Sequence, residues 1–149
     1  MTTNALPSER VAILGTVDPD VLTAAAHTSD YVDMSKFERV MAVVMAGTLG
    51  SSATFDAKLV QATDSSGTSS KDITGKSITQ LTEAGTDSDK QAIINCMAQE
   101  LDVDNGFTHV ALTITVGTAS SDGAGVLLGL DPRYGPASDN DIASVDEIV

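Results

Sequence analysis

Few positions in this chain combine residue types that could do chemistry. The segment Asp102 to Gly106 reads DVDNG, and its clustered oxygens resemble the ligands that calcium prefers. An EF-hand loop also needs a third oxygen ligand before the Gly and an acidic residue at its distal end, where this chain has Thr113. Because Asn-Gly readily supplies the positive φ of a tight turn, we interpret DVDNG as a hairpin turn without an ion.

The other reactive residue types are scattered. A zinc site needs three or four ligands, but His27, His109 and Cys96 are far apart in sequence, and Cys96 lies in an apolar run typical of a buried thiol. The segment ITGKS has only the tail of a phosphate-binding loop, and no serine has the G-x-S-x-G context of a hydrolase nucleophile. The sequence leaves open a pair of carboxylates that would hydrolyse a glycosidic bond. However, its five aromatic residues offer few rings for stacking on sugars. We therefore predict no catalytic residue, no metal and no cofactor, and expect a protein that is not an enzyme.

The composition narrows the class of partner. The chain has 149 residues, enough for one domain, and 42% of them are hydrophobic although only 3% are aromatic. The formal net charge of −13 disfavours nucleic acid and anionic lipid, because binding to phosphates depends on Lys and Arg. The same charge suits either a well-solvated surface or attraction to a basic partner. No secretory signal and no apolar run of about 20 residues is present, so we expect synthesis in the cytoplasm and no membrane contact.

The elements that must position any site are β-strands. Residues 107–118 alternate apolar and polar side chains, residues 53–63 do the same with one wet face, and residues 123–130 supply a last strand. Residues 37–50 are apolar on both faces, which predicts a central strand covered on two sides, with a second subunit as one possible cover. Residues 92–101 suit either a helix or a strand, and their β-branched pair favours a strand.

These patterns predict an all-β protein, an antiparallel β-sandwich for which a jelly roll is one candidate form. We expect three parts: an N-terminal arm at 1–21, the sandwich at 22–130 and an acidic C-terminal arm at 131–149. Apolar residues near a terminus and an Arg-Tyr pair between prolines are typical of protein interfaces. The candidate interface residues are Val11, Ile13, Leu14, Arg133 and Tyr134.

Several segments carry a resemblance to a known group of proteins. These are YVDMSKFERVMAVVMAGTLGSSATFDAKLVQATDSSGT, KDITGKSITQLT, DKQAIIN, ELDVDNGFTHVALTITVGTA and LGLDPRYGPA. They resemble head structural proteins of tailed bacteriophages, and among these the capsid decoration or cement proteins. The similarity extends over most of the chain, from about Pro7 to Ala137.

The resemblance implies a virion structural protein that binds the outer surface of the capsid and stabilises the shell after assembly in the host cytoplasm. The implied partners are the major capsid protein and further copies of the chain, with a trimer favoured. A neck, tail or spike component of the virion is an alternative. A β-sandwich module that binds a receptor or glycan is another.

Overall fold

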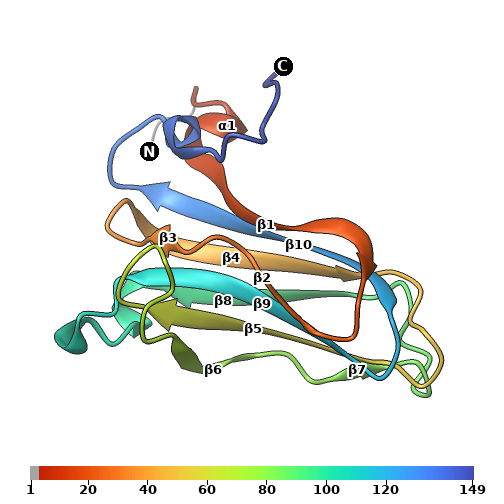
Figure 1. Cartoon of the computed structure of the whole chain (residues 1–149). Helices are drawn as coiled ribbons and strands as arrows, with labels where there is room; N and C mark the ends of the chain where they lie inside the picture. The colour runs from red at the N-terminus through yellow and green to blue at the C-terminus, as the bar shows by residue number, and fades with distance from the viewer. Residues whose placement is uncertain (1–3) are drawn as a thin grey trace.

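The computed structural model describes residues 4–149, and it folds them into two packed antiparallel β-sheets (Figure 1). The first sheet has the order β1 (Val11–Leu22), β10 (Ser121–Pro132), β4 (Phe37–Ala46), β8 (Gln91–Met97). The second sheet has the order β2 (Ala26–Thr28), β9 (His109–Gly117), β5 (Thr54–Ala62), β6 (Lys71–Ser77). The short strands β3 (Val32–Asp33) and β7 (Leu81–Thr82) pair with β9 and β5. The prediction of an all-β sandwich is confirmed.

The pairing has a simple logic that identifies the topology. The first strand pairs with the last, β1 with β10, and the innermost pair is β5 with β6. Between these, β2 pairs with β9 and β4 pairs with β8. A long hairpin rolled up so that its successive pairs alternate between two sheets is a jelly roll. The jelly-roll form of the predicted sandwich is therefore present.

The core lies between the sheets and is built from alternate residues of each strand. On β9, Val110, Leu112 and Ile114 are fully buried, as the period-two pattern predicts. The facing strand β10 contributes glycines to the interior. A Cβ on Gly125 would lie 2.5 Å from Leu112 Cδ2, and a Cβ on Gly123 would lie 2.7 Å from Phe55 Cε2. Large side chains from one sheet thus fill space that glycines leave on the other, which suits a core with few aromatic residues.

Two local predictions fare differently. The ambiguous segment at 92–101 is strand β8 followed by the short 3₁₀ helix η1 (Ala98–Glu100), so the prediction of a strand is confirmed for its larger part. The prediction of a tight hairpin at DNG is wrong, because β8 and β9 belong to different sheets. The segment is η2 (Val103–Asn105), which ends at Gly106 with a φ of 84°. The Asn-Gly pair does contain a residue with positive φ, Gly106. This residue lies in the connection between the two sheets and not in a hairpin.

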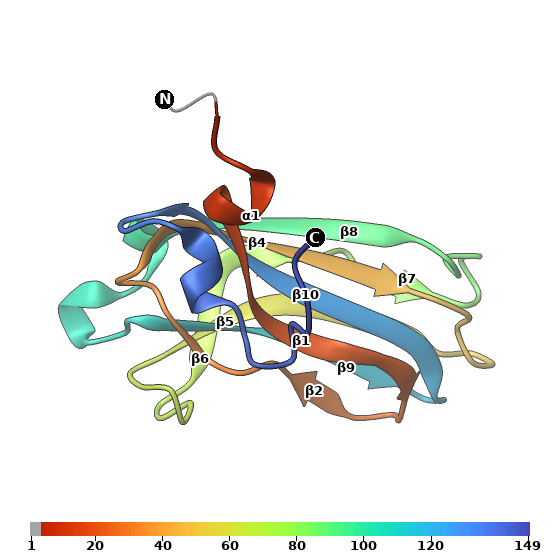
Figure 2. The ribbon, with the colours of Figure 1, turned by 90° about the horizontal axis from the view of Figure 1, so that it is seen from above.

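The two ends of the chain lie on one side of the molecule. The short helix α1 (Pro7–Arg10) leads into β1, and η3 (Ala137–Asn140) packs against both α1 and β1. Figures 1 and 2 show α1 and the C-terminal segment on the outward side of the first sheet. Of the expected N-terminal arm at 1–21, residues 1–3 lie outside the described residues and residues 11–21 belong to β1. Within the expected C-terminal arm, Ala137 is fully buried in the core.

The start of β1 is joined to the C-terminal segment through backbone groups. The Ile13 N–H donates to Asp141 Oδ1 at 2.7 Å, and the Ile142 N–H donates to the Ile13 carbonyl at 2.9 Å. Because the other side of β1 pairs with β10, the C-terminal segment occupies the free edge of β1 at Ile13.

Candidate interaction surface

Among residues 4–149, no three His, Cys, Asp or Glu side chains come close enough to hold a metal ion. The two histidines are on the second sheet, where His27 pairs with Ile114 and His109 pairs with Asp33 and Ala62. Cys96 faces the interior from β8 and is 2% exposed. Burial raises the pKa of its thiol to about 11, and the nearby Glu100 carboxylate adds to this. The thiol is therefore held in its protonated, poorly nucleophilic form.

The outward face of the first sheet is rich in apolar side chains. Pairing aligns Val126 of β10 with Val43 of β4 and then with Ile93 of β8. The next row on this face aligns Leu128, Met41 and Asn95. Neither row carries a charge in these three strands. The inner faces of β4 and β10 are buried against the second sheet. Both faces of these strands are therefore apolar at nearly every position, which is the pattern of strands that are covered on two sides.

Part of this face is open to solvent. Ile93 is 60% exposed, Met45 47% and Met97 45%. Scattered exposed apolar residues are ordinary, whereas a contiguous group of them marks a contact site. The prediction that β4 is a central strand is confirmed, since it lies between β10 and β8. Because the outward face of β4 is partly open to solvent, this face is a candidate contact site.

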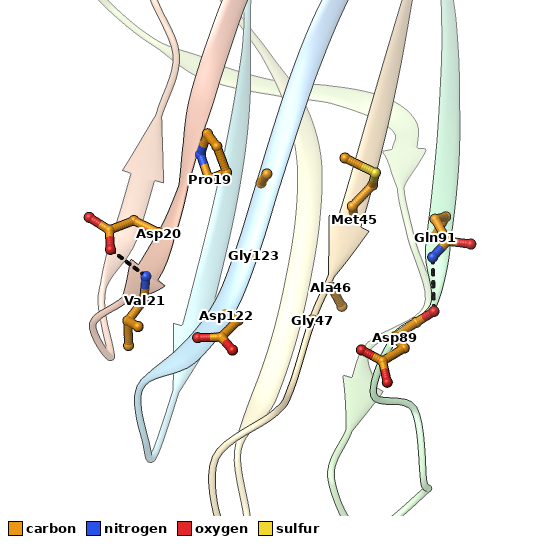
Figure 3. Close-up of a pocket in the computed structure, with 11 residues that line it drawn as sticks. Pro19, Asp20, Val21, Met45, Ala46, Gly47, Asp89, Gln91, Asp122 and Gly123 are labelled. Atoms are coloured by element: carbon orange, nitrogen blue, oxygen red, sulfur yellow. Dashed lines mark hydrogen bonds between the residues drawn. The ribbon is translucent and has the colours of Figure 1, made fainter.

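A hollow of about 530 Å³ lies at one end of the same face (Figure 3). Its lining has apolar side chains from three strands: Pro19 and Val21 of β1, Ala124 of β10, and Met45 of β4. The floor is low because the outward-facing β10 side chain there is the small Ala124, whereas a Cβ on Gly123 would point into the core.

The rim of this hollow is acidic. Asp20, Asp89 and Asp122 line it. The Asp20 side chain accepts from the Val21 N–H at 2.7 Å, and the Asp89 carbonyl accepts from Gln91 Nε2 at 2.8 Å, as Figure 3 shows. The hollow therefore combines an apolar floor with negative charge around it.

A second hollow, of about 700 Å³, is lined by residues that include Met34, Leu101, His109 and Arg133. Asp33 also lines it. Burial raises the pKa of Asp33, but hydrogen bonds from Ser35 and the nearby His109 and Lys36 outweigh this and hold the pKa below its usual value. Acidic and basic groups line this hollow together with apolar side chains, so its rim is mixed in charge, whereas the charged residues that line the first hollow are all acidic.

The candidate interface residues occupy different environments. Val11 and Ile13 are half-buried on the edge strand β1, while Leu14 is 5% exposed and belongs to the core. Arg133 Nε lies 3.3 Å from Glu38 Oε1, and Tyr134 is 82% exposed. Val11 pairs with Leu130, three residues before Arg133. The fold thus brings Val11 and the Arg133–Tyr134 pair to the same end of the first sheet, opposite the acidic hollow, whereas Leu14 points into the sandwich.

Sequence reasoning did not find the hollow. Its residues come from 19–21, 45–47, 89–91 and 122–124, which converge only through strand pairing. The one feature of the sequence that pointed to this surface was the apolar character of β4 on both faces.

No protein-family model matches the chain, and no curated protein matches it in sequence. Among solved structures, a chain of Broad Bean Stain Virus is similar at 11% identity and a TM-score of 0.45, over 91% of this chain and 93% of that one. A chain of the infectious bursal disease virus Gt strain is similar at 13% identity and a TM-score of 0.47, over 93% of this chain and 37% of that one.

A carbohydrate-binding module from the β-sandwich superfamily is similar at 14% identity and a TM-score of 0.36, over 74% of this chain and 44% of that one. This chain thus spans less than half of the infectious bursal disease virus chain and of the carbohydrate-binding chain. No helix among the described residues is long and apolar enough to cross a membrane. By its strand pairing the chain is a jelly-roll β-sandwich.

Proposed function

We propose that this chain is a structural protein of a virion, and that it binds the outer surface of a tailed-phage capsid as a decoration protein. The observation that carries the proposal is the side of the molecule that bears α1, the C-terminal segment and the open apolar face together. A protein that reinforces a shell needs such a side, because it must bury apolar surface against neighbouring subunits. The resemblance of the strand segments to phage head proteins supports the same role.

The mechanism is additive burial between subunits. A stable protein contact usually buries about 1,000 Å² or more, and a shell repeats each contact by symmetry. Many contacts of modest affinity, repeated around the shell, then add up to strong overall binding. The formal charge of −13 keeps the free protein soluble and disfavours contact with packaged nucleic acid.

Tyr134 and Arg133 are the proposed anchors at the end of this side that is opposite the hollow. Tyr and Arg are frequent hot-spot residues, since they add large contact area together with polar groups. An 82% exposed tyrosine is available to a partner without rearrangement of the fold.

The test is occupancy on purified capsids. Deletion of residues 1–9, deletion of residues 143–149 and the substitution Tyr134→Ala are each compared with the wild-type chain by quantitative mass spectrometry of washed particles. The second deletion keeps Asp141 and Ile142, which bind β1, so the sandwich stays intact. We expect each change to lower occupancy, and unchanged occupancy for all three would refute the proposed contact surface.

Copy number separates decoration from its rivals. A decoration protein is expected at on the order of hundreds of copies per particle, because it follows the symmetry of the shell. A neck, tail or spike component would be present at the few copies of a single ring. A glycan array probes the receptor-binding alternative, and specific binding there would count against the decoration role.

A further inference from the structure

The acidic hollow on the first sheet is suited to a particular kind of occupant. Its floor is apolar, through Val21, Met45 and Ala124, and its rim is negative, through Asp20, Asp89 and Asp122. A complementary group therefore presents an apolar side chain next to a cation. A volume of about 530 Å³ is within the size range of sites that hold small ligands or a few side chains.

The chain itself presents such a group on α1. Leu6, which directly precedes this helix, is 64% exposed, and Arg10 is an exposed cation at its last position. Within residues 4–149, the ion pairs of the fold include Arg39 with Asp131 and Arg133 with Glu38, but none with Arg10. Figure 1 shows α1 on the outward side of the first sheet, where it contacts β1, β10 and η3.

The helix cannot fill the hollow of its own molecule. It precedes Val11, which pairs with Leu130, whereas the hollow lies beside Gly123 of the same strand. Those seven residues of β10 extend about 23 Å at about 3.3 Å per residue. The complementary features therefore lie at opposite ends of one outward face, and a contact between them joins two molecules.

We propose that Leu6 and Arg10 of one copy dock into the hollow between β1, β10 and β4 of a second copy. Leu6 contacts the floor at Val21 and Met45, and Arg10 contacts the rim at Asp122. This head-to-tail contact uses two different surfaces of the chain, so repetition closes a ring or continues as a filament. The inference deepens the proposed function by naming one partner of this side, a further copy of the chain.

The test measures the mass of the full chain in solution by sedimentation velocity and multi-angle light scattering. We expect a defined oligomer for the wild type, and dissociation constants raised roughly tenfold or more by Leu6→Glu and by Arg10→Glu. Val103→Glu is the matched control, because Val103 is 55% exposed on η2 and should leave the mass unchanged. Thermal unfolding of each variant verifies that the sandwich is intact.

A charge exchange tests the pairing directly. Asp122→Arg alone should weaken association, and its combination with Arg10→Glu should restore it, because the exchanged charges attract again. In NMR spectra the Met45 methyl resonance should shift on dilution of the wild type and stay fixed in Leu6→Glu. A wild type that is monomeric at its highest soluble concentration, or an oligomer that Leu6→Glu leaves intact, would overturn the inference.

These results are separable from those on capsids. A monomeric chain that still occupies capsids would refute this contact and leave the decoration role standing. An oligomer that responds to Leu6→Glu but never binds capsids would refute the decoration role and support the contact.

Discussion

Ser29 and Leu112, 83 residues apart in sequence, are joined by two hydrogen bonds inside the second sheet. The Ser29 N–H donates to the Leu112 carbonyl at 2.9 Å, and the Leu112 N–H donates to Ser29 Oγ at 3.0 Å. Ser29 follows β2 and is 5% exposed. Its side chain therefore continues the pairing on β9 where the backbone of β2 ends.

Removal of the hydroxyl in Ser29→Ala should destabilise the fold. The substitution leaves the buried Leu112 N–H without its acceptor, and such a loss costs about 1–3 kcal/mol. Ser65→Ala is the control, because Ser65 is exposed. Urea unfolding monitored by circular dichroism gives both values, and equal midpoints for the two variants would contradict this reading.

The substitution Gly125→Val should also destabilise the fold. The new Cβ would lie 2.5 Å from Leu112 Cδ2 and 3.1 Å from Ile114 Cδ1, and overpacking of a filled core typically costs about 1–3 kcal/mol. Ala124→Val adds volume to the next residue on the outward face and serves as the control. The expected result is a lower melting temperature for Gly125→Val alone.

The thiol of Cys96 should be unreactive in the folded protein. Its side chain is 2% exposed and its pKa is raised to about 11, so access and thiolate fraction are both low. Labelling with a maleimide at neutral pH should proceed only after denaturant is added. Rapid labelling of the native chain, followed by mass spectrometry, would show that β8 opens readily.

Glu100 should contribute to a loss of stability in acid. Its carboxylate accepts from the Met97 N–H at 2.8 Å and pairs with Lys76 at 2.9 Å, and these contacts lower its pKa below the usual 4.5. A lowered folded-state pKa adds stability above pH 4.5 that is lost as the pH falls through the folded value. The difference in melting temperature between wild type and Glu100→Gln should thus be largest near pH 7 and vanish in strong acid. A difference that does not change with pH would assign the effect to packing.

The C-terminal segment should be held less tightly to β1 when Asp141 is replaced. In Asp141→Ala the Ile13 N–H loses its acceptor, and a net contribution of about 0.5–1.5 kcal/mol per hydrogen bond corresponds to roughly two- to tenfold faster exchange. Hydrogen–deuterium exchange followed by mass spectrometry of peptides that contain Ile13 measures the change. Asp146→Ala, further along the same segment, should leave this exchange rate unaltered.

Strands are best predicted from the sequence where one face is exposed to solvent or where apolar and polar residues alternate regularly. Residues 109–117 are the clearest case, because Val110, Leu112, Ile114 and Val116 alternate without interruption and all are buried. In β1 the pattern fails. The register shifts between Ile13 and Gly15 and again between Val17 and Asp20, and each irregularity moves later side chains to the other face. Asp18, Pro19 and Asp20 are residue types that favour a turn, yet they lie inside this strand.

The candidate site was beyond the reach of sequence patterns for a different reason. The hollow depends on which strands are neighbours, and the pairing of β1 with β10 joins residues about 100 to 120 positions apart. Local periodicity shows that β4 is apolar on both faces, but it cannot say that Gly123 and Ala124 lie beside Met45. Tyr134 could be named as a candidate interface residue because its residue type and the nearby prolines can be read from the sequence without knowledge of strand pairing.

The tie between Ile13 and the C-terminal segment also limits how the first sheet can grow. With the backbone of β1 already engaged at Ile13, an incoming strand cannot pair with β1 at that position, whereas β8 pairs within the described residues with β4 alone. A sheet that can be extended along one edge only forms at most a dimer, in which β8 of one molecule pairs with β8 of a second. An endless cross-β stack needs two receptive edges, so the contact at Ile13 works against such growth of the first sheet.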